Sequence, residues 1–242
     1  MPSFDSVADA YDVARPAYPE RVYDALEPLA GQLVLEGGAG TGIATRALTS
    51  RGARVVPFDI GALILRKAVA RTPGLPALVA DGARLPFRDD SADLMCFAQS
   101  WHWLDPHRRC GESARVLRSG GRWAGWWSHA RADGDAWFDA HWDTIEATCA
   151  GVFRNQRDID WAQGVRESGL FAVGERVTVS WVRELSVETW LADDRSRSYV
   201  AALPEPARLV LLRELEALVR ARFPNGEMRV PYETWLWVAR KL

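Results

Sequence analysis

Short apolar runs alternate with segments of helical periodicity along the first 130 residues. Strands are predicted for the apolar runs at 33–35, 54–58, 77–80, 92–98 and 122–127, and helices for the periodic segments 19–29, 43–48, 62–70 and 106–117. Because strand–helix–strand units connect through right-handed crossovers, they predict a parallel sheet with helices on both faces. We therefore expect an α/β fold with a doubly wound, mostly parallel, Rossmann-like sheet.

The pattern changes after residue 130. Helical patterns cover 136–150, 159–168 and 205–223, a strand-like run covers 177–182, and alternation over 232–238 indicates a last strand, antiparallel at the edge of the sheet. The long amphipathic helix lies between the last two strands. We therefore predict a core over residues 31–184 and 226–242, with a helical cap inserted over 185–225.

The composition is that of an ordinary globular protein, with 242 residues of which 48% are hydrophobic and 26% charged. The 30 basic and 32 acidic residues give a net charge of -2, so no overall positive field attracts nucleic acid or an anionic membrane. Cys96, Cys110 and Cys149 are too widely spaced for a metal or redox pair, and the N-terminus lacks an apolar targeting segment. We expect a cytoplasmic monomer or homodimer that acts on a small molecule.

Three glycines at alternate positions, Gly38, Gly40 and Gly42, stand where the first predicted strand turns into a helix. Such a turn leaves backbone N–H groups free and lets a ligand approach the main chain. A dinucleotide-binding fingerprint would need Gly or Ala at the positions of Ile43 or Thr45, and a P-loop would need Gly-Lys-Ser/Thr. Because neither pattern is present, the turn is less typical of a dinucleotide-binding site or of a P-loop.

Three acidic residues follow the first three predicted strands: Glu36, Asp59 and Asp81. The carboxyl ends of neighbouring parallel strands border one crevice, so we expect these side chains along a single ligand. Carboxylate groups repel the negative charge of a pyrophosphate and attract a cationic ligand. Asp59 could accept both hydroxyls of a ribose, Asp81 an adenine amino group, and Glu36 could assist a nearby ammonium. S-adenosylmethionine carries these groups together with a sulfonium, so it is the ligand that fits.

The same segment resembles the class I S-adenosylmethionine-dependent methyltransferases. Residues 34–42 (VLEGGAGTG) look like their first motif, Asp59 like their ribose-binding acid, and residues 81–87 (DGARLPF) like their adenine-side motif. Residues 91–94 and 115–121 are similar to the start of the fourth strand and the turn into the fifth. The resemblance implies S-adenosylmethionine as cofactor and S-adenosylhomocysteine as product. It also implies cofactor contacts from Gly38, Gly40, Gly42, Ile60, Gly82 and Ala83.

Two further segments narrow the resemblance to small-molecule methyltransferases. Residues 11–19 (YDVARPAYP) look like the N-terminal segment that folds over the cofactor, which implies covering helices over residues 1–30 with Tyr11 and Arg15 near the methionine end. Residues 99–105 (QSWHWLD) resemble the loop after the fourth strand in the trans-aconitate methyltransferase-like branch. In that loop Gln99 and Ser100 would hold the methionine moiety. The acceptor would contact Tyr18, Trp101, His102 and Trp103.

Methyl transfer is an in-line displacement in which a lone pair approaches the methyl group opposite the departing sulfur. Placement of the reactants and exclusion of water therefore matter most. Apolar walls could come from aromatic side chains. The candidates for these walls are Trp101, Trp103, Trp126 and Trp127.

An alcohol or ammonium acceptor must lose a proton on methylation. His102 and His129 are candidate bases, because they follow the fourth and fifth predicted strands and histidine titrates near neutral pH. His107 and His141 are expected on solvated helix faces. No metal-binding motif occurs in the sequence.

Three alternatives stay open. The first is a nicotinamide-dependent oxidoreductase on the same fold, which Ile43 and Thr45 weaken. The second is a protein that binds S-adenosylmethionine without turnover. The third is a methyltransferase acting on RNA, which the balanced charge disfavours.

Overall fold

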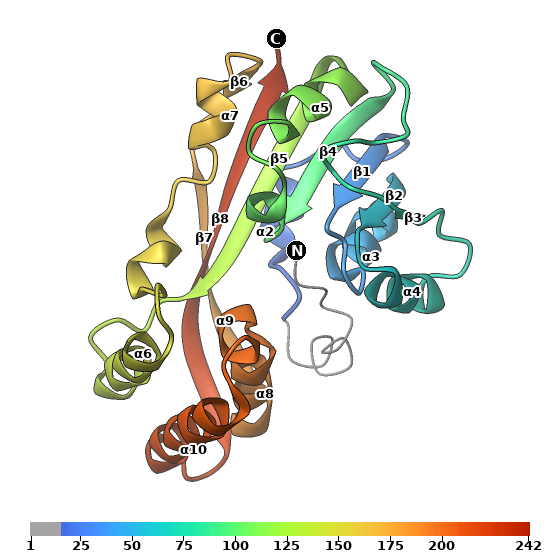
Figure 1. Ribbon diagram of the computed structural model, residues 1–242. Coiled ribbons are helices and arrows are strands. Elements are labelled where there is room, and N and C mark those ends of the chain that lie inside the picture. Colours follow the sequence, from blue (N-terminus) through green and yellow to red (C-terminus); the bar gives the residue numbers. More distant parts are fainter. Residues whose placement is uncertain (1–15) are drawn as a thin grey trace.

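A single mixed sheet runs through residues 16–242, the part of the chain that this computed structural model describes (Figure 1). The strand order is β3-β2-β1-β4-β5-β8-β6, and β7 pairs with β8 alongside β6. The strands are β1 (Leu33–Gly37), β2 (Arg54–Asp59), β3 (Leu78–Val79), β4 (Ala92–Ala98), β5 (Leu117–Ala130), β6 (Phe171–Val173), β7 (Val177–Ser186) and β8 (Glu227–Lys241).

Strands β1 to β5 are parallel, and β8 is antiparallel to β5 and to its two other neighbours. This arrangement confirms the predicted fold class, a mostly parallel Rossmann-like sheet with an antiparallel edge. Strand β5 extends beyond its predicted end because it pairs with β8 as far as Ala130, and β8 begins before its predicted start because residues 227–231 pair with β7. The three residues of β6 are too few for alternation to reveal.

The helices flank the strands in the predicted alternation. The predicted helix over 19–29 ends early, because the proline at position 28 cannot donate a helical hydrogen bond. The helix predicted over 159–168 begins only at Gln163. The residues before it form a turn in which the Asp160 carboxylate accepts the Ala162 N–H at 3.0 Å. The helices are α2 (Glu20–Asp24), α3 (Ile43–Ser50), α4 (Ala62–Arg71), α5 (Arg109–Val116), α6 (Ala136–Thr148), α7 (Gln163–Glu167), α8 (Val187–Ser196), α9 (Ser198–Ala201) and α10 (Glu205–Arg222), with 3₁₀ turns η2 (Trp101–Trp103) and η3 (Arg154–Asp158).

Side chains of the central strands alternate between two buried faces of the sheet. On β4, Leu94 and Cys96 pack into a cluster with residues of α2 and α3. Met95 and Phe97 point the other way, into a cluster with residues of α5 and α7. Helices therefore cover both faces, as a doubly wound sheet requires.

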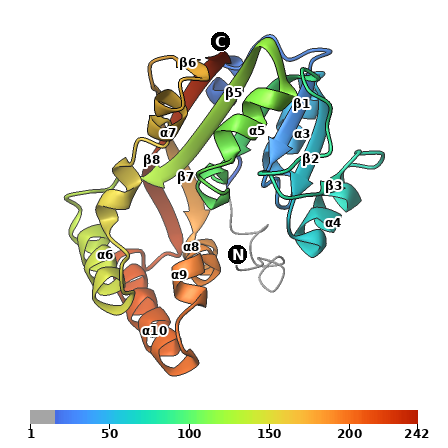
Figure 2. The ribbon, with the colours of Figure 1, turned by 45° about the horizontal axis from the view of Figure 1, so that its top comes forward.

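Helices α6, α8, α9 and α10 gather around the far ends of β7 and β8, and we call them the helical lobe (Figures 1 and 2). The lobe has its own core, which includes Phe138, Trp190 and Leu215. Its helix α6 precedes the range 185–225 predicted for a cap, and the predicted domain boundaries stay predictions. No helix between residues 16 and 242 is long and apolar enough to cross a membrane.

Candidate active site

The turn after β1 is tight enough to need its glycines. Gly38 has φ of 64°, and a Cβ placed on it would lie 2.4 Å from Cβ of Ser100. The Ser100 hydroxyl donates to the Gly37 carbonyl oxygen at 2.5 Å and so ties the loop after β4 to the turn. Gly40, with φ of 57°, would place a Cβ only near Ile64, at 3.7 Å. The turn therefore has one crowded side and one open side.

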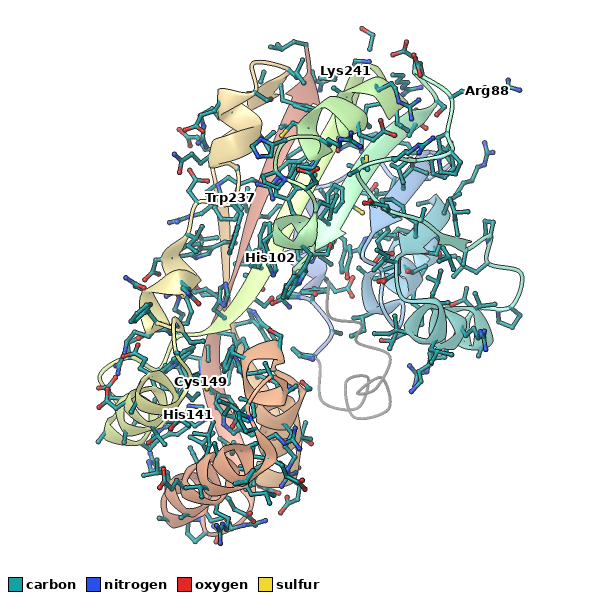
Figure 3. The ribbon with its side chains drawn as sticks, viewed as in Figure 1. Arg88, His102, His141, Cys149, Trp237 and Lys241 are labelled. Atoms are coloured by element: carbon teal, nitrogen blue, oxygen red, sulfur yellow. The ribbon has the colours of Figure 1, made fainter. Side chains whose placement is uncertain are left out.

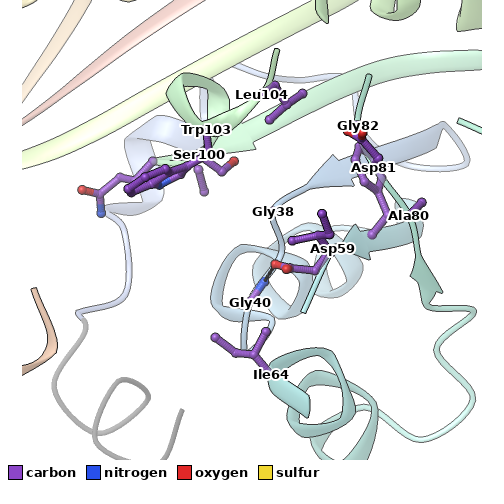
Figure 4. A pocket seen from close by; sticks show the side chains of 14 residues that line it. Gly38, Gly40, Asp59, Ile64, Ala80, Asp81, Gly82, Ser100, Trp103 and Leu104 are labelled. Atoms are coloured by element: carbon purple, nitrogen blue, oxygen red, sulfur yellow. Dashed lines mark hydrogen bonds between the residues drawn. The ribbon is translucent and has the colours of Figure 1, made fainter. Parts of the chain in front are cut away.

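Asp59 closes the open side of this turn. Its Oδ2 accepts the Gly40 N–H at 2.9 Å and its Oδ1 accepts the Gly61 N–H at 2.8 Å (Figure 4). The N–H group of Gly40 is thus bonded to a carboxylate instead of being free, which corrects the expectation of free donors at that residue. A carboxylate in this position repels a phosphate, and its remaining lone pairs suit the hydroxyls of a ribose.

Asp81 lies at the end of β3, on the neighbouring strand tip. Its Oδ1 accepts the Ala83 N–H at 2.9 Å, which fixes the carboxylate beside Gly82. A Cβ on Gly82 would lie 2.6 Å from Leu104, so a side chain there would push the loop outward.

These groups line one pocket of about 110 Å³, which we call the glycine-turn pocket. Figure 4 shows Asp59 and Ile64 on one side of it and Ser100, Trp103 and Leu104 on the other. The structure thus brings together most of the predicted cofactor contacts. Those that line the pocket are Gly38, Gly40, Asp59, Ile60, Asp81, Gly82, Gln99 and Ser100. Trp103, predicted to contact the acceptor, lines it as well.

Three predicted cofactor contacts between residues 16 and 242 do not line this pocket. Glu36 is enclosed behind the turn, where the Thr45 hydroxyl donates to its Oε2 at 2.5 Å. Burial, together with the charge of Asp59, raises the pKa of Glu36 to about 8. Gly42 and Ala83 lie next to the pocket in sequence and do not line it. Tyr18, predicted to touch the acceptor, contacts Gln99.

The positions of Tyr11 and Arg15 lie outside the described residues, so their predicted role near the methionine end stays a prediction.

Gln99 stands between two cavities. Its φ of 56° is unusual for a residue with a side chain, its N–H donates to the Trp126 carbonyl oxygen at 2.9 Å, and its Nε2 donates to the Tyr18 hydroxyl at 3.2 Å. Backbone strain of this kind gathers at functional sites. Gln99 and Trp103 line the glycine-turn pocket and also a second cavity, so the two spaces adjoin.

The second cavity, which we call the lobe cavity, has a volume of about 420 Å³ and lies between the sheet and the helical lobe. Its size falls within the usual range of small-molecule sites. Its wall near the sheet is aromatic, and its far wall carries charged side chains. Lining residues include His102, Trp103, Trp127, His129, Arg157, Trp161, Arg183, Asp193, Arg197 and Tyr199.

His102, labelled in Figure 3, lines the lobe cavity and lies close to three indole rings. Its ring centroid is 4.9 Å from that of Trp103 and 5.0 Å from that of Trp161, and the Trp127 indole N–H donates to its Nδ1 at 3.3 Å. A neutral histidine that accepts at Nδ1 carries its proton on Nε2. Burial, together with the charge of Arg109, lowers the pKa of His102 to about 4, so the ring is neutral at physiological pH.

His129 lies two residues beyond Trp127 on β5, on the same face of the strand. Burial lowers its pKa to about 3, with the charges of Arg131, Arg157 and Arg197 adding to the effect. Within residues 16–242 its Nε2 has no hydrogen-bond partner.

The four candidate tryptophans divide between pocket walls and core. Trp103 and Trp127 line the lobe cavity. Trp101, predicted to contact the acceptor, is instead fully buried in the core against Phe97, with ring centroids 4.6 Å apart. Trp126 packs into the opposite face of the sheet. The dense apolar core between the sheet and α5 leaves Trp101 no route to a ligand.

The charged wall of the lobe cavity was missed from the sequence. Asp193 and Asp194 are buried on α8, and Nε2 of His141 lies 2.9 Å from Oδ2 of Asp194, so the expectation of a solvated His141 is wrong. One feature of the sequence could have indicated the buried position of Asp194. Asp194 continues the apolar stripe of Trp190 and Leu191 at helical spacing, which places it on the buried face.

Among residues 16–242, no group of three or more His, Cys, Asp or Glu side chains is arranged to hold a metal ion. The donors around the glycine-turn pocket are carboxylates, amides and hydroxyls. They fit a nucleoside that bears positive charge better than one that bears phosphates.

Comparison with known proteins agrees with this geometry. The family described as "Methyltransferase domain" matches residues 35–124. An uncharacterized methyltransferase of Mycobacterium tuberculosis is 34% identical over 236 residues, which cover 96% of this chain and 93% of the relative.

Two solved structures share the fold. A putative type II methyltransferase from Anaeromyxobacter dehalogenans superposes with a TM-score of 0.68 at 24% identity, covering 93% of this chain and 96% of that one. Geranyl diphosphate C-methyltransferase from Streptomyces coelicolor, solved with S-adenosyl-L-homocysteine, gives a TM-score of 0.53 at 15% identity, covering 92% and 74%. With a relative matched over nearly its whole length, this chain is an enzyme that belongs to the class I S-adenosylmethionine-dependent methyltransferases.

Proposed function

We propose that the chain binds S-adenosylmethionine in the glycine-turn pocket and transfers its methyl group to an oxygen or nitrogen of a small molecule in the lobe cavity. The observation that carries the proposal is the wall that the two spaces share, formed by Gln99 and Trp103. A methyl donor on one side of this wall and an acceptor on the other would meet within reacting distance. A protein that only binds S-adenosylmethionine does not need a second cavity beside the donor site, so the second cavity favours turnover.

Each side chain of the glycine-turn pocket has a role in this proposal. Asp59, whose orientation is fixed by the Gly40 and Gly61 amides, accepts the two ribose hydroxyls. Asp81 accepts the adenine amino group, and Gln99 and Ser100 face the methionine moiety. S-adenosylmethionine supplies a methyl group on a sulfonium, and its transfer leaves the neutral thioether S-adenosylhomocysteine.

The lobe cavity supplies apolar walls and neutral histidines. Trp103 and Trp127 keep water from the acceptor, which strengthens electrostatic interactions there. With its Nδ1 occupied by Trp127, His102 offers an N–H donor, and this favours an orienting role over the predicted role as base. His129 remains the other predicted base. When a hydroxyl is methylated, its oxygen forms the new bond to carbon and its proton passes to water.

The size and position of the lobe cavity favour a small molecule over RNA, because an acceptor must enter between the sheet and the helical lobe. The net charge of -2 also offers no general attraction for RNA. The C-methyltransferase from Streptomyces coelicolor, solved with geranyl-S-thiolodiphosphate, gives a small-molecule precedent on this fold. A cytoplasmic location and a monomeric or homodimeric state stay predictions.

Calorimetric titration with S-adenosylhomocysteine tests the donor site. Asp59→Asn keeps the shape of the side chain but loses a carboxylate oxygen, and we expect it to weaken binding by about tenfold or more. Asp135→Asn, at an exposed position on the helical lobe, is the control and should leave binding unchanged. Equal affinity of the wild type and Asp59→Asn would refute the ribose assignment. Transfer of labelled methyl groups to small phenols, acids or amines tests turnover.

A further inference from the structure

The lobe cavity has two chemically different ends. Near the glycine-turn pocket its wall is formed by flat aromatic rings, with Trp127 and Trp161 stacked at a centroid distance of 5.2 Å and an interplanar angle of 19°. The ring of His102 lies beside both. The two stacked rings lie too close together to admit a ligand between them, but they present a flat apolar wall on which a flat molecule packs better than a bulky one. This end therefore favours a planar, aromatic body.

The far end of the lobe cavity carries three arginines. The guanidinium of one of them, Arg157, is held by contacts within the protein. Its guanidinium forms an ion pair with Asp133, donates to the carbonyl oxygens of Ala130 and Arg154, and lies over the ring of Trp142 at 5.2 Å. These bonds hold the end of β5 against η3. Arg157 therefore contributes charge to the cavity and is not a group to hold a ligand.

Arg197 makes fewer hydrogen bonds with the protein than Arg157 does. Its Nη2 donates to Asp193 at 3.4 Å, and its Nε lies 3.3 Å from Oδ1 of Asp194 without hydrogen-bond geometry. The Tyr199 hydroxyl, two residues on, is buried beside Arg197 and makes no well-aligned hydrogen bond within the described residues. Buried donors without a well-aligned hydrogen bond are costly, and a ligand oxygen would satisfy both.

The arginines at this end are balanced by carboxylates: Arg157 pairs with Asp133, Arg183 with Asp193, and Arg197 with Asp193 and Asp194. The charge that faces the cavity is that of Arg197, because its side chain is 22% exposed whereas those of Asp193 and Asp194 are 5% and 0% exposed. An anionic oxygen is therefore better placed beside Arg197 than a cationic group.

Strand β5 runs along the cavity from the aromatic end toward the helical lobe. Trp127 and His129 both line the cavity, and Ala130 packs into the lobe core. Two residues of extended strand span roughly 7 Å. The cavity is therefore long enough for one aromatic ring with substituents at opposite ends.

We infer that the acceptor is a planar aromatic carboxylic acid, whose carboxylate is held by Arg197 and Tyr199 and whose opposite end carries the hydroxyl or amine that is methylated. This inference rests on the proposed function, since it assigns the substrate class of the same site. The carboxylate stays unmethylated and acts as an anchor. For a phenol acceptor, the oxygen forms the bond to the methyl carbon, the carbon–sulfur bond breaks with its electron pair going to sulfur, and the phenol proton passes to water.

The test titrates the full chain, saturated with S-adenosylhomocysteine, with para-hydroxybenzoate and with its uncharged amide, para-hydroxybenzamide. The two probes have the same shape and differ in the charge of one end. We expect the acid to bind about tenfold more tightly than the amide. A larger hydroxynaphthoate and its amide, run in parallel, allow for the size of the cavity.

Variants locate the anchor. Tyr199→Phe removes a hydroxyl that makes no well-aligned hydrogen bond, so we expect the fold to be kept. The expected loss of affinity is about tenfold for the acid and about threefold or less for the amide. Arg197→Gln should abolish the preference for the acid. Arg195→Gln, the same change at an exposed position of α8, is its matched control and should keep the preference.

The outcomes separate the two proposals. If S-adenosylhomocysteine itself does not bind, the proposed function fails. If S-adenosylhomocysteine binds but the acids bind no better than their amides, or do not bind, the anionic anchor is wrong and the proposed function stands. If Arg197→Gln does not fold, Tyr199→Phe decides: unchanged affinity for the acid would overturn the inference.

Discussion

Among single residues, burial decides what each carboxyl group of the site can do. Asp59 keeps both oxygens oriented by two backbone donors at the edge of the pocket, whereas Glu36 is enclosed with Thr45 behind the turn. Enclosure favours the uncharged form of a carboxyl group. The two acids look alike in the sequence, each at the end of a strand, and only the packing around them separates their chemistry.

Glu36→Gln should change how stability depends on pH. The pKa of Glu36 is about 8 in the folded chain against 4.5 for an ordinary glutamate, so between these values the folded state holds a proton that the unfolded state has lost. The free energy of unfolding of the wild type, relative to that of Glu36→Gln, should therefore fall as pH rises through this window, by up to about 1.4 kcal/mol per pH unit, and level off above it. The lowered pKa values of His102 and His129 act in the opposite direction below about pH 6.5, but they are common to both proteins and cancel in the difference. Urea unfolding of both proteins at several pH values measures this difference. Equal slopes would show that Glu36 is ionised when folded.

At the scale of secondary structure elements, the helical lobe and the strand tips form separate parts of the site. The glycine-turn pocket is built by residues between Gly38 and Leu104, and the lobe core is built around α6, α8 and α10. Damage to the lobe should therefore reduce stability without changing the donor site.

Leu215→Ala tests this separation. Leu215 on α10 is fully buried in the lobe core, and its truncation should cost about 2–5 kcal/mol in the free energy of unfolding. Leu209→Ala, on the same helix with the leucine 52% exposed, is the control and should cost about 0.5 kcal/mol or less. Denaturant unfolding gives both values. Calorimetry should find the affinity for S-adenosylhomocysteine unchanged in both variants, and a loss in Leu215→Ala would contradict the separation.

The elements differ in how well the sequence predicts them. Strand β4 has its predicted bounds because a run of buried residues is bordered by turn residues on both sides. The extension of β5 to Ala130 and that of β8 back to Glu227 were missed because each depends on pairing with a distant strand, β8 and β7 respectively. By contrast, the glycine turn and Asp59 were predictable from local pattern, while His141 and Asp194, 53 residues apart, meet only through tertiary packing.

For the whole molecule, the expected ligand can be read from its effect on thermal stability. A ligand that binds only the folded chain stabilises it by about 2.7 kcal/mol at 100 times its dissociation constant. For a domain of this size, S-adenosylhomocysteine at that level should raise Tm by about 5–10 °C. NADH should give no shift, because the carboxylate of Asp59 holds the amide that a pyrophosphate would need. Scanning calorimetry measures both, and a shift with NADH alone would favour the oxidoreductase alternative.

Strand β5 belongs to the sheet at its start and to the lobe cavity at its end, so it is one rigid element common to both. The spacing between the two binding sites is therefore set by backbone geometry and not by the side chains that select the acceptor. Exchanging residues on α6, α8 or η3 should redirect the enzyme to acceptors of another shape while its use of the methyl donor is preserved. The lobe is consequently the place to begin when engineering a new substrate range.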